Sequence, residues 1–284
     1  MSRAAETPSL RALFALSTGI SLGYGSVFTL LGAIRETFAF SNTEVGWITG
    51  SGFLAGLVAQ VGLSRFADRG YGTAMVRTGV VLAALGALAM AFAGTVEQWI
   101  GARVILGLGA GCVTPGVRRM ALTADPTRAG ANIGLLSAYE MVGFLLGPLL
   151  ASLLFGWGGL RAPFFGLCLL LVALLPIALR ARVAASSAPS RGPVLRTLLA
   201  RADLQASLAA GIAFYITVGV FEAVWALFMT DLGAGQLFIG LTMSLFTAPM
   251  IFIAPRGGAM AQRHGPLRVA TWSIGVAIAC MLLY

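Results

Sequence analysis

Lysine is absent from the 284-residue chain, histidine occurs once, and charged residues of all kinds make up only 10%. A water-soluble domain of this size needs far more charge to cover its surface, so a soluble globular protein is excluded. The three cysteines, Cys112, Cys168 and Cys280, all lie inside apolar sequence. That placement argues against a disulfide framework or a metal cluster, and no cofactor is expected.

Apolar residues are abundant, at 58% of the chain, and they recur in long runs. Each run has about 20 residues, enough to cross the ~30 Å hydrocarbon core of a bilayer as a helix. A transmembrane β-barrel would instead show alternating segments of ~10 residues, which do not occur. We therefore predict an all-α polytopic membrane protein, with spans over about 12–34, 45–64, 74–94, 97–117, 131–155, 160–180, 204–229, 236–255 and 267–284.

The arginines are distributed unevenly between the two sides of the predicted bundle. Sixteen of the 19 lie at the N-terminus or in connections that follow even-numbered spans, whereas the opposite connections carry only Arg35 and Arg161. By the positive-inside rule the N-terminus is cytoplasmic, and these arginines face anionic lipid rather than nucleic acid. Arginine without lysine, together with much glycine and alanine, indicates a GC-rich bacterial genome, so we expect a bacterial inner membrane.

A short charged turn, Ser64–Gly72, returns 194 residues later as Gly258–Pro266, and each copy lies between two apolar runs. Between the copies, residues 181–203 are rich in alanine, serine and proline, as linkers are. We predict a six-helix bundle over 1–180, a cytoplasmic linker over 181–203, and a partial bundle of three helices over 204–284. A complete second bundle would give roughly 390 residues, so this chain is expected to stop within its ninth transmembrane helix.

The two turns resemble the Gly-x-x-x-Asp-Arg-x-Gly-Arg-Arg motif of the major facilitator superfamily of transporters. In the first copy Asp68 and Arg69 match, while Tyr71 replaces the second glycine. In the second copy Gln262 replaces the aspartate, and the matching residues are Gly258, Arg263 and Gly265. The resemblance implies that this loop is a conformational switch, in which Asp68, Arg69 and Arg77 would hold two spans together. The alternative is a plain topogenic loop with weak surface ion pairs.

The span 97–117 contains a second motif that is similar to one of this family. Arg103 is followed four residues later by a glycine-rich face that includes Gly107 and Gly111. Glycines four residues apart also let helices approach closely, so helix packing is an equally direct interpretation.

The span 131–155 contains Gly143-Phe-Leu-Leu-Gly147-Pro148, which looks like the antiporter motif of the family. Here too the glycines favour close packing, and Pro148 favours a bend. The resemblance covers the whole chain. It implies two pseudo-symmetric helical bundles, the second incomplete, and transport by alternating access.

The resemblance implies a secondary transporter of a small molecule, with proton-coupled efflux of a drug or metabolite as the first interpretation. Its partners would be the solute, protons and the lipid bilayer, and the full-length carrier is expected to be monomeric. The alternatives are a proton-coupled importer of a sugar or organic acid, or a non-transporting membrane scaffold. An enzyme is not expected, because no histidine lies in a span and the hydrolase-like Gly19-x-Ser21-x-Gly23 is buried in one.

Three ionisable residues inside spans are candidates for proton coupling or gating: Arg103, Glu140 and Glu222. Such residues are costly in a bilayer and usually pair, face water or serve function. Arg103 and Glu222 lie at similar depth in the outer half, so we hypothesise that they pair across the outer mouth when it closes. The alternatives are snorkelling for Arg103 and Glu222, and a structural role for Glu140. Aromatic side chains that could line the pathway are Tyr24, Phe28, Tyr139, Tyr215 and Trp225.

Overall fold

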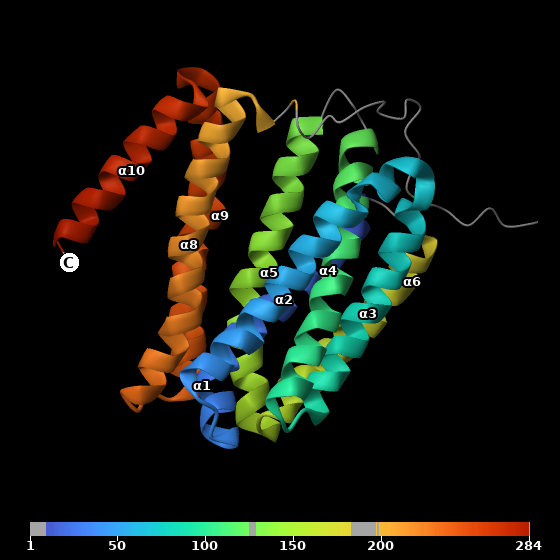
Figure 1. The fold of residues 1–284 in the computed structure, drawn as a ribbon, viewed down its shortest axis with the longest axis vertical. Coiled ribbons are helices and arrows are strands. Elements are labelled where there is room, and N and C mark those ends of the chain that lie inside the picture. Colours follow the sequence, from blue (N-terminus) through green and yellow to red (C-terminus); the bar gives the residue numbers. More distant parts are fainter. Residues whose placement is uncertain (1–9, 125–128, 183–196, 198, 284) are drawn as a thin grey trace, which may run out of the picture. The chain divides into compact units, whose positions relative to one another are not determined.

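The computed structural model describes residues 10–124, 129–182, 197 and 199–283, and these form helices joined by short turns (Figure 1). Because a bilayer offers no hydrogen-bond partners, a spanning segment must satisfy its backbone internally, as a helix does. Each predicted span coincides with one long helix to within a few residues, which confirms the all-α prediction. The helices are α1 (Leu10–Phe38), α2 (Asn42–Phe66), α3 (Gly72–Phe92), α4 (Val96–Ala124), α5 (Ala129–Gly158), α6 (Arg161–Arg180), α8 (Ala202–Asp231), α9 (Gln236–His264) and α10 (Pro266–Leu283).

Eight of these helices are long and apolar enough to cross a membrane, and α10 contains a shorter apolar stretch, Leu267–Cys280. Local sequence defines several helix ends. Ser41 caps α2 by accepting a hydrogen bond from the backbone N–H of Glu44, whose carboxylate accepts one from the Ser41 N–H in return. This reciprocal capping satisfies two backbone donors that would otherwise lack partners.

The internal repeat is visible in the helix boundaries. Helix α9 begins 194 residues after α2, and α10 begins 194 residues after α3, the same offset that relates the two charged turns. Helix α8 therefore corresponds to α1. This correspondence means that the C-terminal ends of α1 and α8 are equivalent positions in the repeat.

The chain divides into two compact units, Met1–Pro189 with Glu222–Thr247, and Ser190–Phe221 with Ala248–Tyr284. The first unit thus contains α1–α6 together with the adjoining ends of α8 and α9. The predicted boundary at 181–203 lies largely outside the described residues and stays a prediction.

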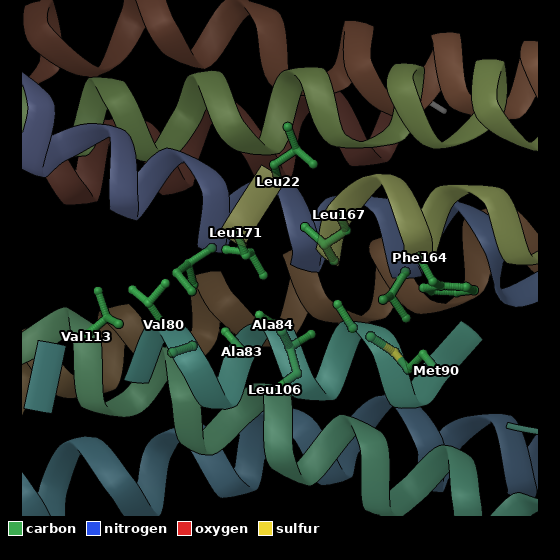
Figure 2. Close-up of a cluster of buried hydrophobic side chains, with 14 of the residues drawn as sticks. Leu22, Val80, Ala83, Ala84, Met90, Leu106, Val113, Phe164, Leu167 and Leu171 are labelled. Atoms are coloured by element: carbon green, nitrogen blue, oxygen red, sulfur yellow. The ribbon is translucent and has the colours of Figure 1, made fainter. Parts of the chain in front are cut away.

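The apolar core of the first unit lies where α1, α3, α4 and α6 meet (Figure 2). Helix pairs α1–α5, α3–α4, α2–α4 and α3–α6 make its most extensive contacts. Outward-facing side chains of the same helices, such as Leu169 and Val172, are apolar and exposed, as expected of a surface that meets lipid. The labelled core residues are Leu22, Val80, Ala83, Ala84, Met90, Leu106, Val113, Phe164, Leu167 and Leu171.

The glycines of the two helical motifs lie at helix contacts. A Cβ atom on Gly107 would strike the backbone carbonyl of Gly52 on α2, and one on Gly111 would lie 2.6 Å from the carbonyl oxygen of Gly56. On α5, a Cβ on Gly147 would lie 2.6 Å from the carbonyl oxygen of Leu22 on α1. Gly143 and Pro148 lie along the same α1–α5 contact. Backbone thus packs directly on backbone, which only glycine permits.

Replacing Gly107 with alanine should destabilise the protein, because the new methyl group must displace the α2 backbone. Overpacking of this kind costs about 1–3 kcal/mol in free energy of unfolding. Gly101→Ala on the same helix is the matched control, since its Cβ would meet nothing within 4 Å. The control should be neutral, or stabilising by up to ~1 kcal/mol. Thermal unfolding of the two purified variants in one detergent makes the comparison, and equal midpoints would contradict this packing.

Candidate functional site

Arg103 lies on α4 and is completely buried, with 0% of its surface exposed. Its Nε donates to the Ile48 carbonyl at 3.4 Å and its Nη2 donates to the Thr49 carbonyl at 3.3 Å, both on α2. These distances are long for N–H···O hydrogen bonds. The third nitrogen, Nη1, is buried and has no hydrogen-bond partner. The guanidinium is therefore enclosed by protein but incompletely coordinated.

Aromatic rings form the other wall around this guanidinium. Its Cζ lies 5.4 Å from the ring centroid of Tyr24 and 5.8 Å from that of Phe53, within cation–π range. Phe53 stacks on both Tyr24 and Phe28, with centroids 5.0 and 5.5 Å apart. Phe53 is nevertheless 42% exposed, so one side of its ring covers the arginine while the rest is accessible.

The hypothesised pair between Arg103 and Glu222 is not formed in this structure. The guanidinium turns toward α2, and no acidic group among the described side chains lies within ion-pair distance of it. The physical reason is local: Arg103 donates instead to two α2 carbonyls and lies against two aromatic rings. Full burial also means that Arg103 does not snorkel to the surface here.

The two candidate acids lie in different surroundings. Glu140 is partly buried on α5. Glu222 is partly buried on α8. Neither acid belongs to the cluster around Arg103.

An ion pair at the C-terminal end of α1 involves Arg35, which the sequence indicates only as a topology signal. Arg35, near the end of α1, binds the carboxylate of Asp231, the last residue of α8. Its Nη1 also donates to Asn42 Oδ1 at 3.1 Å. Arg35 and Asp231 are 196 residues apart, close to the repeat offset of 194, so they occupy equivalent ends of equivalent helices. That near-match is the signal that could have found them.

Further contacts lie behind this ion pair. Gln236 Nε2 on α9 donates to the Thr29 carbonyl on α1 at 2.7 Å, and Ser244 Oγ donates to the Leu145 carbonyl on α5 at 2.7 Å. Thr230 packs against Gly32, where the absence of a side chain makes room for it. We call the ion pair and the Gln236–Thr29 bond, together with the packing at Gly32, the α1–α8 gate. It lies on the predicted outer side.

A cavity of about 380 Å³ adjoins the gate. Polar side chains of Arg35, Asn42 and Asp231 contribute to its wall, and the rest of the lining is mainly apolar. The remaining lining residues are Val45, Gly46, Thr49, Ala223, Val224, Leu227 and Phe228. Thr49 also supplies the carbonyl that holds Arg103, so α2 lines the cavity at the same residue that binds the buried arginine.

The first charged turn differs from the family motif in the position of its glycine. Gly70 adopts φ 98° within a short π-helical turn, Ala67–Tyr71, and Gly265 adopts φ 89° between α9 and α10. The left-handed residue in the first copy is therefore Gly70, one position before Tyr71. This backbone geometry favours glycine, and the shift explains how Tyr71 is tolerated.

The side chains of the predicted switch are mostly at the surface. Arg69 and Arg263 are exposed, Arg77 is partly buried, and Gly258 continues α9. The side chain of Asp68 lies outside the described residues, so its predicted role stays a prediction.

The remaining pathway candidates are spread over the chain. Tyr139 packs edge-on against Phe14 with centroids 5.7 Å apart. Trp225 donates from Nε1 to Thr242 Oγ1 at 3.0 Å. Tyr215 is 70% exposed in the second unit. The structure therefore gathers Tyr24 and Phe28 around Arg103 but does not bring Tyr139 or Trp225 into that cluster.

Known proteins resemble this chain along its whole length. The family model of the Major Facilitator Superfamily matches residues 13–284. The chain is 26% identical over 269 residues to the uncharacterized MFS-type transporter YuxJ of Bacillus subtilis (strain 168), covering 88% of this chain and 67% of that one. It is 29% identical over 228 residues to the 3-(3-hydroxy-phenyl)propionate transporter of Escherichia coli (strain K12), covering 76% and 54%.

The fold also matches a solved structure. A bacterial homolog of the human lysosomal transporter Spinster, in an inward-facing and unoccupied conformation, superposes with a TM-score of 0.71 and 17% identity. The match covers 94% of this chain and 64% of that one. Among the relatives it matches in sequence, the chain spans between 38% and 67% of their own lengths.

Reversing the charge of Arg35 should open the α1–α8 gate, because Asp231 would then face a like charge. Exposed ion pairs contribute about 0.2–1 kcal/mol, so the open population should rise up to about fivefold. A cysteine replacing the buried Thr29 reports opening through its rate of reaction with a membrane-impermeant maleimide. Arg35→Glu should raise that rate, and Arg35→Glu with Asp231→Arg should restore it. A double variant that labels as fast as the single one would show that the pair does not hold the gate.

Proposed function

Because this chain belongs to the Major Facilitator Superfamily, we propose that the protein it forms is a secondary transporter that moves a small molecule by alternating access. One observation carries the proposal: the α1–α8 gate joins equivalent ends of repeat-related helices. Alternating access needs a contact of this kind, which closes one mouth of the pathway and can break.

The composition of the gate suits repeated opening. Its ion pair is partly solvated, with Arg35 and Asp231 side chains 16% and 59% exposed. Such pairs are weak, and the hydrogen bond from Gln236 to Thr29 adds about 0.5–1.5 kcal/mol. A closed state held by contacts of this size can exchange with an open one, and a solute that prefers either state shifts their populations.

We propose proton-coupled efflux across a bacterial inner membrane, with the N-terminus in the cytoplasm. The sequence Gly143-x-x-x-Gly147-Pro148 on α5 supports this, through its resemblance to the antiporter motif. Glu140 lies one turn before Gly143 on the same helix, and Glu222 lies on α8, so both remain the proposed proton-exchanging groups. The charged turns would act as the switch on the cytoplasmic side, and the carrier would work as a monomer.

A second candidate function is uptake of an organic acid. It is favoured by the similarity to the 3-(3-hydroxy-phenyl)propionate transporter, which extends over 76% of this chain. The same gate would serve either direction, because alternating access is reversible. The direction of the proton gradient that drives flux in vesicles distinguishes the two candidates.

Locking the gate should stop transport. Cysteines replacing Arg35 and Asp231, in a background without the three native cysteines, can be joined by a short bis-maleimide. Crosslinking should abolish solute flux in proteoliposomes, because α1 and α8 could no longer separate.

The matched control joins Arg35→Cys to Asn42→Cys, which lies beside Arg35 on the neighbouring helix of the first repeat. That crosslink should leave most of the flux intact. Equal flux before and after the Arg35–Asp231 crosslink would rule out this gate as a moving part of transport.

Removing the titratable group at Glu222 should reduce the pH dependence of transport. Glu222→Gln keeps the size and polarity of the side chain but cannot exchange a proton. Flux measured between pH 5 and 8 should vary in the unmodified protein and vary clearly less in Glu222→Gln, where Glu140 can still titrate. Glu97→Gln, an exposed change at the start of α4, is the control and should retain the variation. An unaltered profile in Glu222→Gln excludes this residue from coupling.

A further inference from the structure

The positive charge of Arg103 has no counter-ion in this structure. Its side chain is 0% exposed, and no carboxylate among the described side chains lies within ion-pair distance. A guanidinium has five N–H donors, but only two nitrogens are engaged, each by one long bond to a backbone carbonyl. Burying a charge without a partner is strongly unfavourable. The site is therefore electrostatically suited to receive an anion.

A purely structural role explains only part of this arrangement. Arg103 does join α4 to α2, and a Cβ on Gly52 would lie 3.0 Å from its Cζ, so space has been left for the guanidinium. However, a neutral amide could donate to the same two carbonyls without burying a charge. The contact between α4 and α2 explains the hydrogen bonds of Nε and Nη2. It explains neither the buried positive charge nor the absence of a hydrogen-bond partner for Nη1 among the described residues.

The neighbouring rings indicate what kind of anion would fit. Tyr24, Phe28 and Phe53 form a stack in which Phe53 contacts both other rings, and Phe53 is 42% exposed. The planar fork of an arginine matches a carboxylate, and aromatic rings offset-stack on one another favourably. The guanidinium and the aromatic rings together match a ligand with a flat apolar ring and a carboxylate.

We propose that Arg103, Tyr24 and Phe53 form the recognition site for an aromatic carboxylic acid, with the carboxylate on the Arg103 guanidinium and the ring against Phe53. The inference rests on the proposed transport function for its physiological meaning, since it names the substrate class of that transporter. In this proposal Phe53 would move aside to admit the carboxylate, while Tyr24 keeps its cation–π contact with the guanidinium.

The test compares two compounds that differ only in charge, 3-phenylpropionate and 3-phenylpropanamide. Equilibrium binding to the full purified chain is measured by displacement of radiolabelled 3-phenylpropionate in detergent. The carboxylate should bind at least about tenfold more tightly than the amide, as expected for a charge-assisted hydrogen bond. Arg103→Gln should reduce this ratio to about one. Arg161→Gln, which changes an exposed arginine at the start of α6, should leave it unchanged.

A second variant keeps the test decisive if Arg103→Gln does not fold. Phe53→Leu removes the ring but retains the guanidinium. It should preserve the preference for carboxylate over amide and lose the preference for 3-phenylpropionate over hexanoate. If Phe53 has only a structural role, Phe53→Leu should lower the affinity for both acids equally. That result would overturn the assignment of the ring as a contact for the ligand.

Failure of this inference is distinguishable from failure of the proposed function. Three results would overturn the site, whether or not the protein transports another solute. They are equal affinity for the carboxylate and the amide, no binding of either compound, and a tenfold affinity ratio that persists in Arg103→Gln. An Arg103-dependent ratio without flux in proteoliposomes supports the site and counts against transport.

Discussion

The ion pair between Arg35 and Asp231 is the contact on which the functional account of this protein depends. It connects α1 to α8, two helices that occupy equivalent places in an internal repeat. Packing elsewhere in the first unit is close, with backbone against backbone at Gly107 and Gly147. The gate is instead small, polar and partly solvated. Rigid helix pairs joined by a weak contact are what a moving pathway requires, since the pairs stay intact while the contact breaks.

Arg103 shows how the rigid and the moving parts are connected. The guanidinium is held by α2 carbonyls at Ile48 and Thr49, and Thr49 also lines the cavity next to the gate. A displacement of α2 at the gate would therefore alter the coordination of Arg103 directly. An occupant of the proposed arginine site and the state of the proposed gate would thus be coupled through α2.

Much of the fold could be predicted from the sequence, because an apolar run of about 20 residues has few alternatives to a spanning helix. The repeat offset likewise placed α9 and α10 correctly. The site was harder. Arg35 and Asp231 looked like loop charges, and only tertiary structure shows that they meet. Arg103 was expected to face Glu222, yet side-chain direction and nearby carbonyls decide its partners. Gly70 takes the left-handed position that the motif assigns to the next residue, a shift that sequence alignment alone misplaces.

The most direct test of the central claim is a distance distribution between the ends of α1 and α8. Spin labels replacing the exposed residues Glu36 and Leu232 would lie beside the ion pair without disrupting it. Pulsed electron paramagnetic resonance in liposomes should show two distances, short and long. We expect the ratio of the two distances to change with pH and with added solute. A single short distance that neither condition alters would contradict a gate between these helices.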